Sequence, residues 1–137
     1  IENVEFQQLE FADYLGRLDE KGATGPFRLG WGMDYPSPQN FLEPLFASYN
    51  SPPVGSNSAF YNSAEFDDLI AQGNAAAVDG LEAAVPVYQQ AEDVLCEDVP
   101  AIPMFWRKNQ FAWSERVDGV HVDLFGDINY AEIEVVG

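Results

Sequence analysis

The first 31 residues alternate between strand-like and helix-like patterns, and this alternation constrains the fold most strongly. Residues 1–11 (IENVEFQQLEF) place apolar side chains at alternate positions, Val4 and Phe6, which is typical of a strand. Residues 11–22 carry apolar side chains on one helical face, and residues 27–31 (FRLGW) are typical of a second, short strand. Because strand, helix, strand is the building unit of an α/β sheet, the sequence predicts an α/β fold.

Three further helices are expected, near residues 38–47, 64–74 and 80–97. Ser63 can cap the second of them. The third carries an apolar stripe at helical spacing, formed by Leu81, Val85, Tyr88, Ala91 and Leu95.

Beyond the longest helix, three segments have strand-like patterns. Two are aromatic, residues 103–106 (PMFW) and 109–113 (NQFAW), and the third is the alternating tail at 129–136 (NYAEIEVV). We expect these segments to complete the sheet.

The charge is strongly acidic: 23 Asp and Glu against 6 Lys and Arg give a net charge of −17. Nucleic acids and anionic membrane surfaces need clustered basic residues, so neither is an expected partner. The chain has one cysteine, Cys96, and one histidine, His121, too few for an internal disulfide or a Cys/His zinc site. No cofactor is expected, and Cys96 is expected to be a buried thiol on the helical stripe.

Several motifs resemble one family in their order and spacing. The strongest is GWGMDYPSPQNFLEPLF at residues 30–46. It is followed by Tyr61-Asn62, Glu65-Phe66-Asp67-x-Leu69-Ile70, Tyr88-x-x-Ala91-Glu92, Asp98-x-Pro100-Ala101-Ile102-Pro103 and Val117-x-Gly119. Together they resemble the C-terminal part of the extracellular solute-binding proteins of ABC importers, of the peptide/nickel type that includes the oligopeptide- and dipeptide-binding proteins.

The resemblance implies a fragment of one lobe of a two-lobed, type II periplasmic-binding-protein-like receptor, with a mixed sheet flanked by helices. Residues 1–115 would form part of the ligand-binding lobe, and residues 116–137 would return toward the other, N-terminal lobe. The family captures solutes outside the membrane and delivers them to membrane permease subunits. It therefore implies an extracytoplasmic location, in the periplasm or at the cell surface with a lipid anchor, and no catalysis.

The resemblance also implies a ligand site at residues 30–38. Asp34 matches an aspartate that pairs with the free α-amino group of a bound peptide, although an Asp before Pro36 can also cap its own turn. Trp31 would pack on the ligand or stay in the core. Gly30 and Gly32 would let a bound chain approach the backbone closely, and at least one of Met33 and Tyr35 is expected to face inward.

Three further residues are weaker candidates for the site. Arg28 resembles a position that meets the ligand carboxylate, and Trp106 and Arg107 match positions where relatives place tyrosines. Arg107 departs from that aromatic pattern. Ser37 also departs from the family, where an acidic residue is common.

Other solutes and other functions stay open. Members of the same family also carry oligosaccharides, opines, glutathione and metal complexes. A nickel ligand is disfavoured because the chain has a single histidine. A sugar ligand could stack on Trp31 and Trp106. A carboxylate-pair hydrolase is the least favoured alternative, because no recognisable catalytic motif is present. A third alternative is an interaction domain whose acidic face meets a basic partner.

Overall fold

A computed structural model describes residues 4–105 and 108–137. Its α-helices are α1 (Phe11–Asp19), α2 (Gln39–Phe46), α3 (Ala64–Ala76) and α4 (Leu81–Asp98). Short 3₁₀ helices are η1 (Ser48–Asn50), η2 (Ala77–Asp79) and η3 (Tyr130–Glu132). The strands β1 (Val117–Asp118) and β2 (Glu134–Val135) form an antiparallel pair in which Val117 faces Val135.

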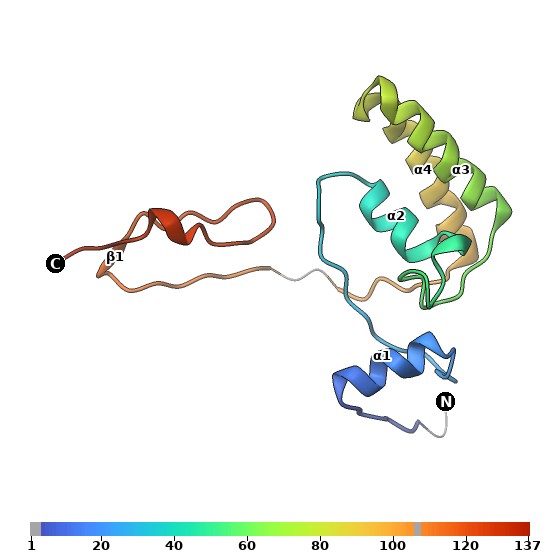
Figure 1. Cartoon of the computed structure of the whole chain (residues 1–137), viewed down its shortest axis with the longest axis horizontal. Coiled ribbons are helices and arrows are strands. Elements are labelled where there is room, and N and C mark those ends of the chain that lie inside the picture. Colours follow the sequence, from blue (N-terminus) through green and yellow to red (C-terminus); the bar gives the residue numbers. More distant parts are fainter. Residues whose placement is uncertain (1–3, 106–107) are drawn as a thin grey trace.

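Helices α2, α3 and α4 pack into one helical unit (Figure 1). Its core contains aromatic and aliphatic side chains from all three helices. They are Leu42, Ala47, Phe66, Ile70, Ala84, Tyr88 and Ala91, with Phe46, Tyr61, Leu69, Ala76, Val94 and Leu95 packed at the edge. Tyr88, Ala91 and Leu95 of the predicted α4 stripe do lie in or against this core, whereas Leu81, the first residue of the stripe, is 43% exposed.

Helices α3 and α4 approach closely at Gly73. A Cβ atom at this position would lie 2.3 Å from Cε1 of Tyr88 and 2.6 Å from its Cδ1. Only glycine leaves room for the buried Tyr88 ring at this crossing. The Tyr88 hydroxyl is nevertheless satisfied, because it donates to Oδ1 of Asn74 at 2.8 Å.

The helix starts follow the sequence closely. Ser63 caps α3 as predicted: its Oγ accepts a hydrogen bond from the Phe66 N–H at 3.3 Å. Ser37 accepts a similar bond from the Gln39 N–H at 3.3 Å, where α2 begins. The prediction of a buried Cys96 is wrong, since its side chain is exposed on the outer face of α4.

A buried asparagine fixes the loop between α2 and α3. Asn57 has no solvent exposure, and its Nδ2 donates to the carbonyls of Ala47 (3.1 Å) and Tyr61 (2.8 Å). Its Oδ1 accepts from the Tyr61 N–H at 3.1 Å. This one side chain satisfies loop backbone groups that would otherwise be buried without partners.

Most of the segments predicted to be strands do not form strands in the structure. Residues 4–10, 27–31, 103–105 and 109–113 are not assigned to any strand. A strand needs a neighbour for its N–H and C=O groups, and no neighbouring strand lies beside these segments in the described residues. Residues 134–135 of the tail do pair, so the described sheet has two short antiparallel strands in place of a mixed sheet.

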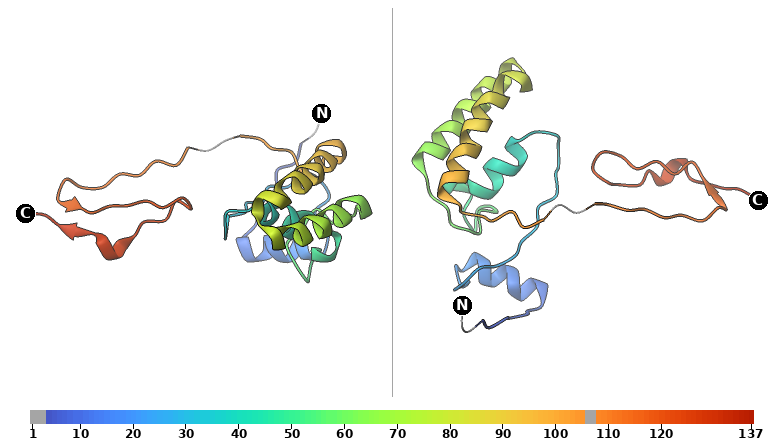
Figure 2. Two further views of the ribbon diagram at one scale, coloured as in Figure 1. Left: turned by 90° about the horizontal axis from the view of Figure 1, so that it is seen from above. Right: turned by 180° about the vertical axis from the view of Figure 1, so that it is seen from behind.

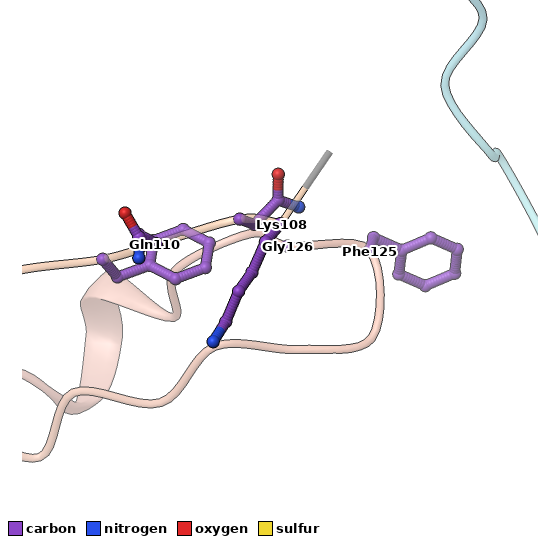
Figure 3. Close-up of a pocket in the computed structure, with 6 residues that line it drawn as sticks. Lys108, Gln110, Phe125 and Gly126 are labelled. Carbon is purple, nitrogen blue, oxygen red and sulfur yellow. The ribbon is translucent and has the colours of Figure 1, made fainter. Parts of the chain in front are cut away.

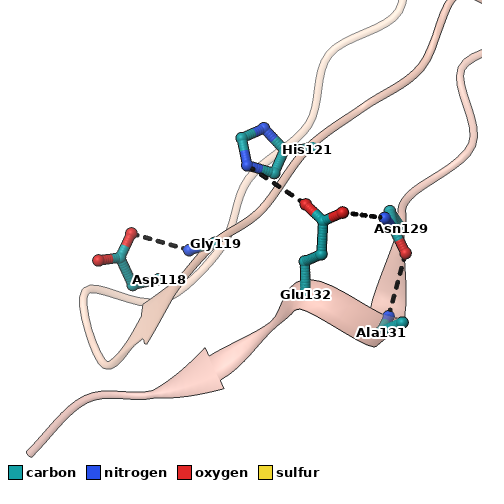
Figure 4. A network of polar contacts seen from close by, with 6 residues as sticks. All are labelled: Asp118, Gly119, His121, Asn129, Ala131 and Glu132. Atoms are coloured by element: carbon teal, nitrogen blue, oxygen red, sulfur yellow. Dashed lines mark hydrogen bonds and ion pairs between the residues drawn. The ribbon is translucent and has the colours of Figure 1, made fainter.

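Residues 108–137 form a C-terminal arm that extends away from the helical unit (Figures 1 and 2). The arm doubles back on itself, with an isolated bridge between Val122 and Ile128 and the β1–β2 pair near its end. Side chains also hold it: Glu132 accepts from Asn129 Nδ2 at 2.8 Å and lies 3.6 Å from the His121 ring nitrogen (Figure 4). The boundary expected near residue 115 stays a prediction.

In the part of the chain that the structure describes, no helix has the length and apolar character needed to cross a lipid bilayer.

Candidate functional site

The candidate site lies on the turn that leads into α2. Trp31, Gly32, Asp34 and Tyr35 are all exposed there, Trp31 at 36% and Tyr35 at 43%. Met33 is half-buried, in line with the expectation that one neighbour of Asp34 faces inward. The structure thus brings five of the predicted residues onto one short, accessible segment.

Asp34 is fixed by Asn40. The backbone N–H of Asp34 donates to Oδ1 of Asn40 at 2.9 Å, and Nδ2 of Asn40 donates to Oδ2 of Asp34 at 3.2 Å. Asn40 is only 2% exposed, whereas the Asp34 residue is exposed. Among the described residues no backbone N–H donates to the Asp34 carboxylate, so the turn-capping role considered for Asp34 is not seen; the Asn40 side chain closes the turn instead.

The two glycines beside Trp31 have open space around them. A Cβ atom built at Gly30 or at Gly32 would meet no heavy atom within 4 Å. No described part of the chain covers this stretch of backbone, so another molecule has room to approach it.

A second polar network begins at Tyr35 and continues into the helical unit. The Tyr35 hydroxyl donates to Gln39, and Nε2 of Gln39 donates to Oε2 of Glu43. Glu43 also accepts from the Tyr49 hydroxyl and from Nδ2 of Asn74, each at 2.9 Å. A chain of hydrogen bonds therefore links the turn to α2 and α3.

This network shifts the pKa values of its members. Burial would raise the pKa of Glu43, but the three donated hydrogen bonds outweigh it and hold the pKa below its ordinary value. Burial, reinforced by the Glu43 carboxylate, raises the pKa of Tyr49 well above its usual range and raises that of Tyr88 as well. Glu43 is therefore held as a carboxylate, and the two tyrosines are held as neutral hydroxyls.

The other predicted residues lie elsewhere or are not described. Arg28 is exposed on the extended segment before the turn, and its carbonyl accepts a 2.6 Å hydrogen bond from the Tyr14 hydroxyl of α1. Trp106 and Arg107 lie outside the described residues. Ser37 is half-buried and serves the start of α2.

One hollow on the surface lies in the C-terminal arm, away from the turn. Its volume is about 520 Å³, and its lining includes Lys108, Phe111 and Phe125 (Figure 3). A second hollow of about 260 Å³ lies between α3 and α4, beside Leu69 and Val94. In residues 4–105 and 108–137, no group of three or more His, Cys, Asp or Glu is placed to hold a metal ion.

Comparison with known proteins finds that this chain is similar to part of two binding or structurally characterised proteins. It is 31% identical over 108 residues to the glutathione-binding protein GsiB of Shigella dysenteriae and to that of Escherichia coli K12. Its fold matches the structure of HbpA2 from Haemophilus parasuis with a TM-score of 0.63 and 28% identity, over 93% of this chain and 24% of that one. The chain is homologous to part of a peptide-type ABC-importer solute-binding protein. No family model matches the chain.

The match to HbpA2 over 93% of this chain confirms the predicted fragment of one lobe of a periplasmic-binding-protein-like fold, although the described strands do not form the predicted mixed sheet. The homologues are substrate-binding proteins and not enzymes, and they are periplasmic. The match with GsiB includes 79% of this chain, but the chain spans only about a fifth (21%) of GsiB.

Two residues of the site were missed by sequence reasoning. Asn40 and Glu43 stand inside the motif at 30–46, where they were treated only as part of the resemblance. The available signal for Asn40 was its place in the first turn of a helix, where Asn and Asp side chains commonly bond to nearby backbone. For Glu43 the local signal was Gln39, four residues earlier on the same helix, whereas its partner Asn74 is 31 residues away and could not be predicted.

Proposed function

We propose that the protein containing this chain captures a peptide-like solute outside the membrane and passes it to ABC permease subunits. Asp34 would pair with the α-amino group of that solute. The observation that supports this most directly is an exposed carboxylate, anchored through one oxygen by a buried amide, beside an exposed Trp31 and the open backbone at Gly32.

The chemistry of the site suits an ammonium group. A carboxylate attracts a cation and accepts charge-assisted hydrogen bonds, which are about twice as strong as neutral ones. Trp31 can add a cation–π contribution. Glutathione, the ligand in the names of the curated relatives, has a free α-amino group and two carboxylates, so it fits the same ligand class.

Arg28 would meet a ligand carboxylate. Arg28 is exposed, and its side chain takes part in no ion pair with a described residue. A guanidinium binds a carboxylate through two parallel hydrogen bonds. Trp106 and Arg107 would line the same cleft from the segment after α4. The remainder of the receptor, including its N-terminal lobe, would supply the opposite wall, since closure buries most of a ligand's surface.

The test uses the full-length protein that contains this chain, freed of ligand. Its affinities for glutathione, trialanine and N-acetyl-trialanine are measured by isothermal titration calorimetry, with Asp34→Asn as the variant. This substitution removes the charge and keeps an oxygen for the bond from Asn40. We expect about 10- to 100-fold weaker binding of trialanine, the loss expected for a hydrogen bond to a charged group.

The matched control is Asp68→Asn, the same change at an exposed aspartate on α3. It should leave the affinity for trialanine unchanged. Equal binding of trialanine and its acetylated form by the wild type would refute the role of Asp34 and favour another solute, such as an oligosaccharide, an opine or a metal complex.

A further inference from the structure

The side chain of Asn40 is buried and engaged twice with Asp34. Burying an amide without hydrogen bonds is costly, and Asn40 meets this demand through Asp34. It accepts from the backbone N–H and donates to Oδ2 of the carboxylate. Both the turn and the direction of the carboxylate therefore depend on one side chain.

Asn40 stands on a well-anchored element. It is the second residue of α2, and Leu42, two positions further on, is part of the helical core and 4% exposed. A polar group on a packed helix is held more precisely than one on a loop. The exposed Asp34 thus takes its position from a side chain that is itself fixed by the core.

The two oxygens of Asp34 have different surroundings. Oδ2 accepts the hydrogen bond from Asn40, whereas Oδ1 accepts none from any described residue. A carboxylate can accept several hydrogen bonds, and an ammonium group has three to donate. One oxygen is therefore used to fix the side chain, and the other is left for a ligand.

We propose that Asn40 is a positioning residue for ligand capture, which holds Asp34 so that Oδ1 meets the ligand's α-amino group. This inference rests on the proposed pairing of Asp34 with that group. Pre-setting the carboxylate removes the loss of side-chain freedom that would otherwise oppose binding. Asn40 acts only through Asp34 and makes no contact with the ligand.

A double-mutant cycle in the full-length protein tests this role, with trialanine as the probe and calorimetry as the readout. Asn40→Leu keeps the branched side-chain shape and removes both polar atoms, and Asn40→Ala, which cannot overfill the site, is measured in parallel. Each is made alone and together with Asp34→Asn. We expect Asn40→Leu to weaken trialanine binding about tenfold when Asp34 is present and less than twofold with Asp34→Asn.

A purely structural role would give a different result. If Asn40→Leu weakens binding equally with Asp34 and with Asp34→Asn, the positioning role is wrong while the pairing of Asp34 stands. If Asp34→Asn alone leaves trialanine affinity unchanged, the proposed function fails and this inference fails with it. Asn62→Leu, at an exposed asparagine outside the turn, is the matched control and should leave affinity unchanged.

One measurement needs no substitution at Asn40. In protein labelled with ¹⁵N only at asparagine, the side-chain amide signal of Asn40 should shift when trialanine is added. The shift should be absent with Asp34→Asn. A signal that does not respond to trialanine in the wild type would overturn the inference.

Discussion

At the residue scale, Glu43 connects α2 to α3 through its carboxylate, which accepts from Asn74 at 2.9 Å. Its pKa is below the ordinary value: burial acts in the opposite direction, but the donated hydrogen bonds outweigh it. A lowered pKa in the folded state means that the unfolded chain binds the proton more tightly. The stabilisation is therefore complete above the ordinary pKa of Glu and is lost as the pH falls through the folded value.

We expect Glu43→Gln to lower the free energy of unfolding by about 1 kcal/mol at about pH 7, after allowance for solvent screening. The difference between the variant and the wild type should shrink as the pH falls from about 5 to about 3, because Glu43 then becomes neutral in both states. Urea unfolding followed by circular dichroism at several pH values measures this difference in the free energy of unfolding.

Glu92→Gln, at an exposed site on α4, serves as the control and should follow the wild type throughout. A Glu43→Gln difference that stays constant from about pH 7 to about pH 3 would show that the carboxylate does not carry the effect.

The candidate site shows which residues a sequence can reveal. Trp31, Gly32, Asp34 and Tyr35 were predicted together because the motif that contains them resembles a family's ligand-binding segment, and residues so near in sequence stay close in space. The partner of Asp34 was not predicted. Its bond to Asn40 exists only because the chain doubles back over six residues into α2, and motif spacing does not specify that geometry.

At the scale of elements, the contact between α3 and α4 depends on the absence of a side chain at Gly73. We expect Gly73→Ala to destabilise the helical unit by about 1–3 kcal/mol, because the added methyl would overlap the ring of the buried Tyr88. Thermal unfolding followed at 222 nm measures the loss.

Gly16→Ala in α1 is the matched control for the same substitution. Nothing lies within 4 Å of its added Cβ, so replacing a helical glycine there should stabilise by about 0.5–1 kcal/mol. Equal melting temperatures for Gly73→Ala and the wild type would mean that α3 and α4 are further apart than the structure places them.

Helices were predictable from the sequence and most strands were not, for a physical reason. A helix satisfies its hydrogen bonds locally, so its apolar period and caps suffice, as the Ser63 cap and the buried Phe66 and Ile70 show for α3. A strand needs a partner strand. Residues 27–31 have the right pattern, but no neighbouring strand lies beside them in the described chain.

At the scale of the whole molecule, the chain combines a packed helical unit with long extended segments. Residues 100–105 and 108–113 make no backbone hydrogen bond to any described residue. Large apolar side chains on them are exposed, namely Ile102, Met104, Phe105, Phe111 and Trp113. The region matched by this chain is only 21% of GsiB, so a full-length relative has much more chain available to contact such segments.

Unpaired backbone and exposed apolar side chains on one segment make a template for aggregation of the isolated chain. Repulsion from the net charge of −17 opposes it at low ionic strength. We expect the 137-residue chain to stay dispersed in dilute buffer and to form thioflavin-positive assemblies in about 1 M NaCl, where the screening length falls to about 3 Å. Light scattering at low and at high salt would follow the assembly.

The double variant Ile102→Lys with Phe111→Lys should delay assembly in high salt, because charged side chains on an exposed edge hinder strand addition. Val78→Lys with Val54→Lys, at two exposed apolar positions outside those segments, is the matched control and should delay it less. The acidic surface would then give colloidal stability, because repulsion between copies of the chain keeps their unpaired segments apart.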